Sequence, residues 1–455
     1  MIDACRGRVY TERVRTYAEA LTVLTSLIDY ERSPAPGNVA GFWNLDRVRD
    51  ALARVGDPHL RLRIAHIAGT KGKGSTAAML AAILRTAGRR VGLFTKPHLL
   101  SFCERIRCDD QLIPEEDFAA LVEELQSVIA ASRDCGDPLT FFETVVILAF
   151  LWFTRQAVDI VVLETGLGGR LDATNVAAPV VTGLTTIALD HLVELGKTLE
   201  QVAAEKAGII KPGVPVVCAP HTPEVAAVIA ATARALGSPL VCVGKDLQIL
   251  PNGSTPDAAQ VFTVRGRLAS YVDLHCPLLG AHQQVNAAVA IGMAECLGEM
   301  GEPVTPAAIR RGLELVDWPG RLQLLRELPA VLLDGAHDPI AVTALLAALD
   351  RHYPDRRRHF IIGFAGDKDW RQMLRQLLPT AASMTLTTAD SPRAAPVASL
   401  LAEATFCGVT AIVAPDVATA LQHRQLVASP QDLICVTGSF AIVGDALRWW
   451  KSVVY

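Results

Sequence analysis

Short apolar, β-branched runs alternate with amphipathic helical stretches from about residue 61 onward. This alternation is typical of parallel sheets whose strands are joined by crossover helices, so the sequence predicts the α/β class. Helices are expected at 115–132 and 140–153, and the second is apolar nearly all round, as a buried helix is. The strands predicted in the first half of the chain are 62–68, 90–95, 159–164, 180–188, 214–219 and 239–244.

The length of 455 residues exceeds what one hydrophobic core of roughly 250–300 residues supports, so two domains are expected. A break follows the helical run 305–316, where Trp-Pro-Gly at 318–320 precedes a second series of strands. We therefore place the predicted boundary between domains 1–316 and 317–455, the second being smaller and Rossmann-like.

Composition excludes several classes of function. With 43 Lys and Arg against 47 Asp and Glu, the chain has a net charge of −4 and no basic field for nucleic acid. The ten cysteines show no Cys-x-x-Cys pair and no zinc-finger spacing, which indicates reduced thiols. The longest apolar runs, such as 145–153, are about half of a bilayer crossing, and the start of the chain lacks the apolar core of a signal peptide. We expect a cytoplasmic protein without nucleic-acid or membrane partners.

An apolar strand runs into a glycine-rich turn and then an alanine-rich helix at 66–84. The glycines let consecutive backbone N–H groups face a polyphosphate at the helix N-terminus, where the macrodipole favours negative charge. Lys73 would reach the outer phosphates, and Ser75 or Thr76 would meet Mg²⁺. The predicted nucleotide-binding residues of this N-terminal, P-loop-type domain are Gly69, Thr70, Lys71, Gly72, Lys73, Gly74, Ser75 and Thr76.

This loop is not a regular Walker A motif, because a glycine separates Lys73 from Ser75 and the loop is shorter. A generic glycine turn before a helix would explain the glycines, but neither the two lysines nor the Ser-Thr pair at the helix start. ATP or another nucleotide is therefore the predicted ligand.

Two further strand ends carry polar residues. Glu164 ends the strand 159–164, and a carboxylate there suits Mg²⁺, although a turn-forming acid is the alternative. Asp190 and His191 follow the next strand, and a helix carrying Lys206 comes after them. Taken alone, His191 is more often structural, and Lys206 resembles an ordinary surface lysine.

Together these strings resemble the folylpolyglutamate synthase family, including the bifunctional dihydrofolate synthases, within the Mur ligase superfamily. The resemblance extends from about residue 40 to 440. Its pieces are GTKGKGS (69–75), PHLL and ERIR (97–107), ETGLGGRLDATN (164–175), DH (190–191), EKAGIIKPG (205–213), GAHQQVNAAVA (280–290), WPGRLQ (318–323), DGAHDP (334–339), SPRA (391–394) and VTGS (436–439).

The resemblance implies roles for individual residues. It places Ser75, Glu164 and His191 in or near the magnesium shell and Lys73 on the phosphates. It further implies that Lys206 is N-carboxylated and holds a second Mg²⁺. On the adenine side of ATP, it implicates Asn286, Arg321, Asp334 and His337.

The function implied is that of an ATP-dependent carboxylate–amine ligase. It would join L-glutamate to a folate, to dihydropteroate, or to both through an acyl phosphate, as a monomer using ATP and two Mg²⁺ ions. One alternative is a cell-wall Mur ligase, although 164–175 and 334–339 fit folate ligases better and little room precedes residue 61 for a UDP-binding domain. The other is a non-catalytic nucleotide-binding protein, which would need the loop but not Glu164, His191 and Lys206 together.

One position departs from the family pattern. The residue before Pro-His-Leu is commonly a serine that helps to hold Mg²⁺, and here it is Lys96. A protonated lysine has three donors and no acceptor, so it cannot bind a metal. Lys96 either turns toward the ATP phosphates as an additional cation or points to solvent while a water takes the serine's place.

Overall fold

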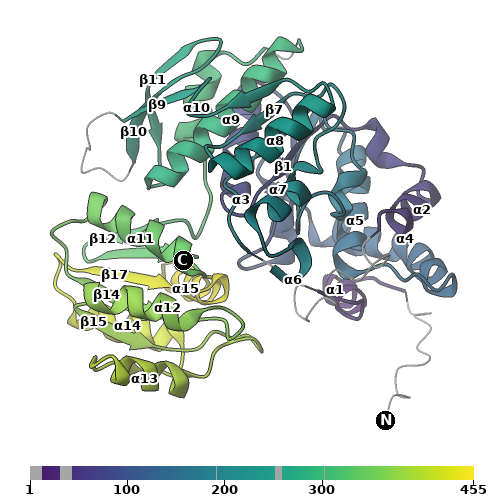
Figure 1. Ribbon diagram of the computed structural model, residues 1–455. Coiled ribbons are helices and arrows are strands. Elements are labelled where there is room, and N and C mark those ends of the chain that lie inside the picture. The colour runs from purple at the N-terminus through teal and green to yellow at the C-terminus, as the bar shows by residue number, and fades with distance from the viewer. Residues whose placement is uncertain (1–12, 31–43, 191, 252–258, 302, 455) are drawn as a thin grey trace. The chain divides into compact units, whose positions relative to one another are not determined.

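Parallel strands form the centre of each of the two units into which the chain folds (Figure 1). The computed structural model describes residues 13–30, 44–190, 192–251, 259–301 and 303–454. Unit 1 is formed by the described residues of Met1–Lys96, Cys103–Asp246 and Val289–Val304, and unit 2 by those of Pro97–Phe102, Leu247–Ala288 and Thr305–Tyr455. Neither unit is one continuous stretch, and a boundary between residues 316 and 317 stays a prediction.

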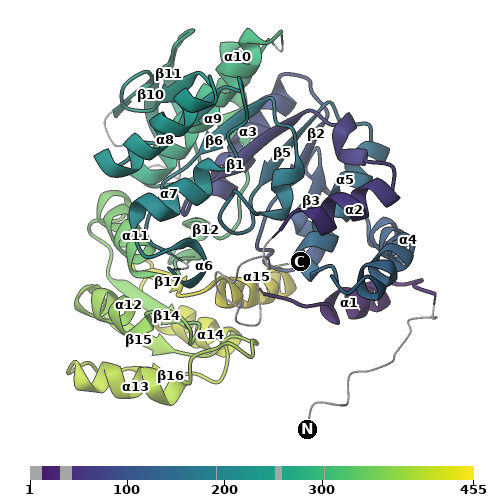
Figure 2. The same ribbon diagram turned by 45° about the vertical axis from the view of Figure 1, so that its right-hand side comes forward.

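Unit 1 contains an eight-stranded sheet in the order β4-β3-β2-β5-β1-β6-β7-β8. The pairs from β2 to β8 are parallel, whereas β3 and β4 add an antiparallel edge. Every residue of β1 and β5 is buried, as expected for strands covered on both faces (Figure 2). The strands are β1 (Ile64–Ala68), β2 (Val91–Phe94), β3 (Ile106–Cys108), β4 (Gln111–Leu112), β5 (Ile160–Glu164), β6 (Val181–Leu184), β7 (Val216–Cys218) and β8 (Leu240–Cys242).

Neighbouring residues of β6 show how the helices cover this sheet. A Cβ on Gly183 would lie 2.5 Å from the sulfur of Met293 in α9 (Ala281–Glu299), whereas Leu184 packs with residues of α7 and α8. Since successive strand residues point to opposite faces, these helices cover opposite faces. The first eight helices along the described chain are α1 (Tyr17–Thr25), α2 (Asp46–Arg54), α3 (Lys73–Thr86), α4 (Glu115–Asp134), α5 (Phe141–Arg155), α6 (Leu192–Leu195), α7 (Leu199–Ala207) and α8 (Pro223–Ala235), with 3₁₀ turns η1 (Pro58–Arg61), η2 (Phe102–Arg105) and η3 (Ala173–Val176).

Unit 2 holds a six-stranded sheet in the order β12-β13-β17-β14-β15-β16 and a three-stranded antiparallel sheet in the order β11-β10-β9. In the larger sheet only the pairing of β12 with β13 is antiparallel. The strands are β9 (Gln248–Pro251), β10 (Gln260–Arg265), β11 (Ser270–Cys276), β12 (Gln323–Glu327), β13 (Ala330–Asp334), β14 (Arg358–Ile362), β15 (Ser383–Leu386), β16 (Ile412–Val413) and β17 (Leu433–Thr437).

Two cores lie on opposite faces of the larger sheet of unit 2. Leu332 packs with residues of α11, α12 and α13, whereas its neighbours Val331 and Leu333 pack with residues of α14 and α15. Figure 1 shows the first three helices along one face of the strands. The remaining helices are α9 (Ala281–Glu299), α10 (Pro306–Leu315), α11 (Pro339–His352), α12 (Trp370–Leu377), α13 (Val397–Phe406), α14 (Val417–Val427) and α15 (Phe440–Val454), with η4 (Leu378–Thr380).

The α/β prediction is confirmed, since all the strands predicted in the first half correspond to β1, β2 and β5–β8. The sequence did not reveal the small antiparallel sheet. Its strand β11 has exposed and buried residues in an irregular mixture, so it lacks the continuous apolar run of a parallel strand. In the part of the chain that the structure describes, no helix is long and apolar enough to cross a membrane.

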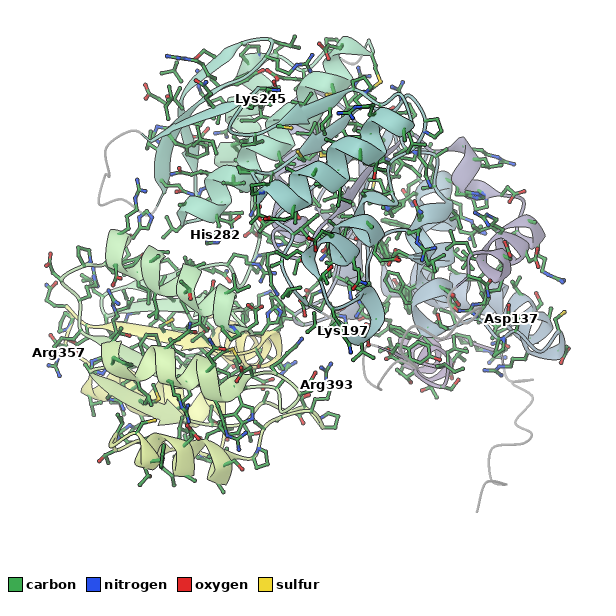
Figure 3. The ribbon with its side chains drawn as sticks, in the orientation of Figure 1. Asp137, Lys197, Lys245, His282, Arg357 and Arg393 are labelled. Carbon is green, nitrogen blue, oxygen red and sulfur yellow. The ribbon has the colours of Figure 1, made fainter. Side chains whose placement is uncertain are left out.

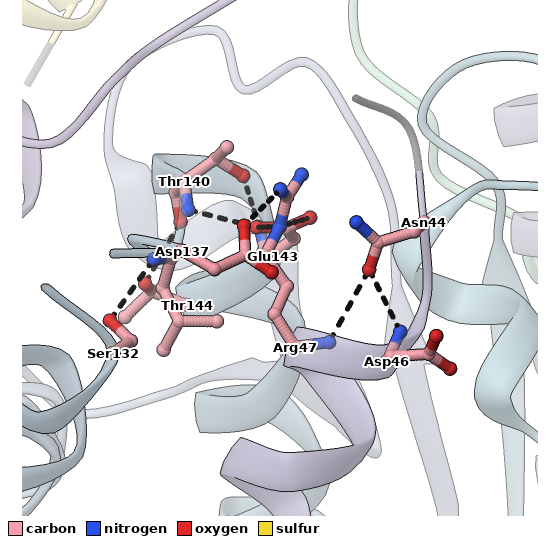
Figure 4. Close-up of polar contacts among 9 residues, drawn as sticks. Asn44, Asp46, Arg47, Ser132, Asp137, Thr140, Glu143 and Thr144 are labelled. Atoms are coloured by element: carbon pink, nitrogen blue, oxygen red, sulfur yellow. Dashed lines mark hydrogen bonds and ion pairs between the residues drawn. The ribbon is translucent and has the colours of Figure 1, made fainter. Parts of the chain in front are cut away.

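A buried ion pair ties the N-terminal helix α2 to α5 in unit 1 (Figure 4). Arg47 Nε donates to both carboxylate oxygens of Glu143, at 2.8 and 2.9 Å, and Arg47 Nη1 lies 2.9 Å from Asp137. The side chains of Arg47 and Glu143 are only 7% and 8% exposed. Glu143 also accepts the N–H of Thr140 in the capping box that begins α5, so this carboxylate serves both the helix start and the ion pair.

We predict that Arg47→Met lowers the free energy of unfolding by about 3 kcal/mol, because it leaves the Glu143 carboxylate buried without its cation. The measurement is the thermal midpoint Tm by circular dichroism. Arg49→Met is the matched control on the same helix: its pair with Asp46 is exposed and should be worth less than about 1 kcal/mol. Equal Tm values for the two variants would show that the buried pair of Arg47 and Glu143 stabilises the fold no more than an exposed pair does.

Candidate active site

The turn after β1 is built on glycines that the backbone requires. Gly69 has φ 153°, and a Cβ there would lie 1.9 Å from the Oγ1 of Thr185, so no other residue fits. Gly72 has φ 87° and immediately precedes α3. The turn therefore brings the first N–H groups of α3 to the carboxyl end of β1, where an anion is favoured.

Backbone hydrogen bonds fix this turn to the chain that follows β6. The N–H groups of Thr70 and Lys71 both donate to the carbonyl of Thr186, at 2.8 and 3.1 Å. The hydroxyl of Thr70 donates to the carbonyl of Ala188 at 3.0 Å. The Nζ of Lys71 lies 3.3 Å from the carboxylate of Asp190. The turn thus has a defined shape before any ligand is considered.

Two lysines converge on one carbonyl of the turn. The Nζ of Lys73 and the Nζ of Lys206 each donate to the carbonyl of Gly69 at 3.0 Å. Lys206 is 4% exposed, and its burial together with the charge of Lys73 lowers its pKa to about 7. Desolvation also lowers the pKa of Lys73, against the opposing effect of the Glu164 carboxylate. This arrangement of cations is suited to an anionic ligand.

Glu164 lies at the carboxyl end of β5, where its side chain is 4% exposed. Its Oε2 accepts the N–H of Lys96 at 3.1 Å, so the turn after β2 meets the end of β5. Desolvation is the main cause of the lowered pKa of Lys73, and the positive charge of Lys96 adds to it, whereas Glu164 opposes it. Because β2, β5 and β1 are neighbours in the sheet, Lys96, Glu164 and the turn at Gly69 share one edge.

The loop after Glu164 is docked on the end of α7, the helix that carries Lys206. The N–H of Arg170 donates to the carbonyl of Glu205 at 2.7 Å, and the Nδ2 of Asn175 donates to the carbonyl of Gly208 at 3.1 Å. These contacts fix the position of Lys206 relative to Glu164.

A buried network beneath this loop was missed at the level of sequence. The Nε2 of His66 lies 2.8 Å from the Oγ1 of Thr174. The hydroxyl of Thr174 donates to the carboxylate of Asp172 at 2.5 Å. Asp172 also accepts the N–H of Leu167 at 2.7 Å. Burial raises the pKa of Asp172 and lowers that of His66 to about 3. The local sequence signal for this network is the Asp-x-Thr spacing at 172–174, which is typical of a capped turn. In the structure Asp172 caps η3 by accepting the N–H of Thr174.

Oxygen donors for a metal are present at the same edge. The side chains of Ser75 and Thr76 are buried in the first turn of α3. The hydroxyls of Thr76 and of Thr165, the residue after Glu164, are buried without a hydrogen-bond partner in the structure. Among the described residues, no three His, Cys, Asp or Glu side chains form a metal cluster. His191 lies outside the described residues.

The structure brings together three of the residues predicted for the adenine side, all in unit 2. The guanidinium carbon of Arg321 lies 4.4 Å from the ring centre of Phe440, and the ring of His337 lies 5.0 Å from the same ring. Asp334 is the last residue of β13, and Arg321 opposes the rise in its pKa that burial causes. Phe440, which follows the string VTGS, was not predicted.

Asn286 belongs to the same neighbourhood of unit 2. It is 3% exposed on α9 and donates to the side chain of Gln283 at 2.9 Å. Residue 282 is one turn earlier on the same helix face. The side chain of His282 is exposed and lies within reach of the positive charge of Arg321, which places this face of α9 near Arg321.

Comparisons with known proteins give one consistent result. The chain matches the models of the Mur ligase middle domain over residues 67–294 and of the Mur ligase glutamate ligase domain over 320–440. It is 35% identical over 411 residues to a dihydrofolate synthase/folylpolyglutamate synthase of Bacillus subtilis, covering 90% of this chain and 95% of that protein. It is 37% identical over 357 residues to a folylpolyglutamate synthase of Lacticaseibacillus casei, covering 77% and 82%. The structure of Mycobacterium tuberculosis folylpolyglutamate synthase complexed with ADP is similar with a TM-score of 0.86 at 29% identity, covering 96% of this chain and 99% of that one.

The lowered pKa of Lys206 generates a prediction about stability. The unfolded chain keeps this proton up to about pH 10.5, whereas the folded protein loses it near pH 7, so wild-type stability gains from rising pH in that window. Lys206→Met carries no such proton. Its Tm relative to wild type should therefore increase as the pH falls from about 10 to about 7, and then level off.

The measurement is Tm against pH without nucleotide in buffers free of carbon dioxide. Lys197→Met, at an exposed lysine of the same unit (Figure 3), should leave Tm close to wild type at each pH. If the difference in Tm between Lys206→Met and wild type does not change with pH, the pKa of Lys206 is not lowered in the folded protein.

Proposed function

Because the chain belongs to the folylpolyglutamate synthase and dihydrofolate synthase family of Mur ligases, we propose that the site described above joins L-glutamate to a folate, to dihydropteroate, or to both, using ATP. The observation that carries the proposal is the meeting of Lys73 and Lys206 at the carbonyl of Gly69, beside Glu164. This is a phosphate loop with added cations and a metal-binding carboxylate, which a simple nucleotide-binding module does not need.

The chemistry follows from the substrates. A carboxylate is a poor acyl donor, so the terminal carboxylate of the acceptor attacks the γ-phosphate of ATP and ADP leaves. The acyl phosphate that results is attacked by the amino group of glutamate, which forms the amide and releases phosphate. The protein contributes positioning and charge stabilisation, and none of its side chains becomes covalently attached.

We assign Lys73 to the outer phosphates, and Ser75 and Glu164 to Mg²⁺. The oxygen donors fit this ion, which typically takes one or two protein groups together with phosphate and water. When bound, Mg²⁺ would neutralise charge on the transferring phosphoryl group. His191 is retained as a predicted Mg²⁺ ligand together with Ser75 and Glu164, and Lys206 in its N-carboxylated form as a predicted ligand of a second ion.

The environment of Lys206 supports this modification. Only a neutral amine adds to carbon dioxide, with formation of an N–C bond and release of one proton. A pKa of about 7 keeps much of Lys206 neutral near neutral pH. Its conversion from a cation to an anion would relieve repulsion with Lys73 and create a ligand for Mg²⁺.

We assign the adenine side of ATP to the cluster in unit 2. The ring of Phe440, with Arg321 and His337 against it, offers flat surfaces suited to a base, and Asp334 and Asn286 offer hydrogen-bonding groups. That the protein acts as a cytoplasmic monomer, without nucleic-acid or membrane partners, stays a prediction.

The direct test is ADP release from pure protein with ATP, Mg²⁺, L-glutamate and either dihydropteroate or a tetrahydrofolate. We expect glutamate-dependent ADP release with at least one acceptor, and the acceptor used distinguishes the two activities. Release only with a UDP-linked cell-wall precursor would favour a Mur ligase of the cell wall. A lack of ADP release with every acceptor would favour a non-catalytic nucleotide-binding protein.

We predict that Lys73→Ala and Glu164→Ala each lower kcat by at least about 10²-fold, since each removes charge stabilisation of the transferring phosphoryl group. Circular dichroism should show an unchanged fold. Lys197→Ala is the control that removes an exposed lysine of the same unit. Near-wild-type turnover of either variant would rule out the assignment of that residue.

We predict that Lys96→Ser raises the KM for ATP by about 10-fold and changes the Mg²⁺ dependence, because the charge of Lys96 acts on Lys73 and Asp172 and is therefore directed into the site. Lys96→Arg keeps a positive charge and should have a smaller effect. The measurement is ligase activity titrated with ATP and with Mg²⁺. If neither titration changes, Lys96 does not bind phosphate.

We predict that Lys206→Ala loses ligase activity and recovers part of it when short-chain carboxylates such as acetate are added, since these supply the missing anionic ligand. The same additions should not rescue Lys73→Ala, which lacks a cation. The measurement is ADP release over a range of carboxylate concentrations. Unimpaired activity of Lys206→Ala would show that the modification is not needed.

A further inference from the structure

Two cysteines of unit 1 lie side by side on neighbouring strands. Cys218 is the last residue of β7 and Cys242 the last residue of β8. The strands are parallel, and these two residues are direct partners in the register. Their side chains therefore project from the same face, and the two sulfur atoms are 3.5 Å apart.

The backbone holds both residues in place. The carbonyl of Cys218 accepts the N–H of Val243 at 2.9 Å. The N–H of Cys242 donates to the carboxylate of Asp246 at 2.8 Å, and the N–H of Asp246 donates back to the carbonyl of Cys242 at 2.8 Å. The sheet and this turn therefore hold the backbone of both cysteines in place.

The two thiols differ in access and in chemistry. Cys242 is half-buried on the edge strand of the sheet, whereas Cys218 is buried against the core that α7 and α8 cover. The S–H of Cys218 donates to the sulfur of Cys242, which lowers the pKa of Cys242 and raises that of Cys218. Cys242 is thus the better nucleophile, and Cys218 is placed to react second.

We propose that Cys218 and Cys242 form a thiol–disulfide exchange site that takes a small disulfide, such as glutathione disulfide, as its oxidant. The thiolate of Cys242 attacks one sulfur of the oxidant, forming a mixed disulfide and releasing one glutathione thiolate. Cys218 loses its proton and attacks the Cys242 sulfur, forming the intramolecular disulfide and releasing the second glutathione. The two cysteines are oxidised by two electrons, and one glutathione disulfide is reduced to two thiols.

The product is compatible with the sheet. Neighbouring strands are about 4.8 Å apart, which lies within the Cα separation of about 4.4–6.8 Å found in disulfides. The sulfurs must approach from 3.5 Å to about 2.05 Å, a movement within reach of side-chain rotation. The site does not involve the residues assigned to ATP and is independent of the proposed ligase function.

The test is incubation of the reduced full-length protein with glutathione disulfide, followed by non-reducing peptide mapping by mass spectrometry. We expect a peptide pair linked through Cys218 and Cys242, lost on treatment with dithiothreitol. Cys218→Ala should instead accumulate glutathione on Cys242, and Cys242→Ala should react at neither position. Cys135→Ala and Cys407→Ala, at exposed cysteines, are matched controls and should still form the linked pair.

The peptide map of the wild-type protein tests the disulfide between Cys218 and Cys242 even if a variant fails to fold. A stable glutathione adduct on Cys242 without the linked peptides would overturn the proposal, because Cys218 would then not act as the second thiol. Oxidation confined to Cys135 and Cys407 would overturn it as well, since simple exposure would then determine reactivity.

Discussion

The carbonyl oxygen of Gly69 receives hydrogen bonds from two lysines that belong to different helices, Lys73 of α3 and Lys206 of α7. That carbonyl is held by a turn that leaves no room for a side chain, because Thr185 lies against the Cα of Gly69. Burial, together with the nearby charge of Lys73, lowers the pKa of Lys206 to about 7, because two ammonium groups at one oxygen are unfavourable without an anion. The site is therefore built for a ligand of high negative charge.

Strand order determines which groups meet this turn. β2, β5, β1 and β6 are consecutive in the sheet, so the residues after their carboxyl ends lie along one edge. Lys96 follows β2, Glu164 ends β5, and Thr186 follows β6 and fixes the turn. Their order along the chain differs from their order in the sheet, and the parallel arrangement alone brings them together. Chemistry that the sequence distributes over more than a hundred positions is thus assembled by the fold.

Features that depend on neighbouring residues were predictable, and those that depend on distant packing were not. The glycine turn between β1 and α3 and the place of Glu164 at the end of β5 were predictable, because the strand, the turn and the helix follow one another in the chain. Lys206 resembled a surface lysine in the sequence, yet it is 4% exposed. Its burial could not be predicted, because its partner Gly69 is 137 positions away in the sequence. The contact of His66 with Thr174 spans 108 positions, and no local pattern indicates it. The half-exposed antiparallel sheet β9–β11 escaped for a similar reason, because its strands lack continuous apolar runs.

The proposed mechanism requires that the carboxylate of the acceptor is phosphorylated before the amine attacks. The decisive measurement uses acceptor labelled with ¹⁸O in its terminal carboxylate, with mass analysis of the phosphate released during ligation. An acyl phosphate intermediate requires that one labelled oxygen leave with the phosphate, so labelled phosphate should appear in step with product. Phosphate that carries no label, while the amide forms at a normal rate, would contradict the account.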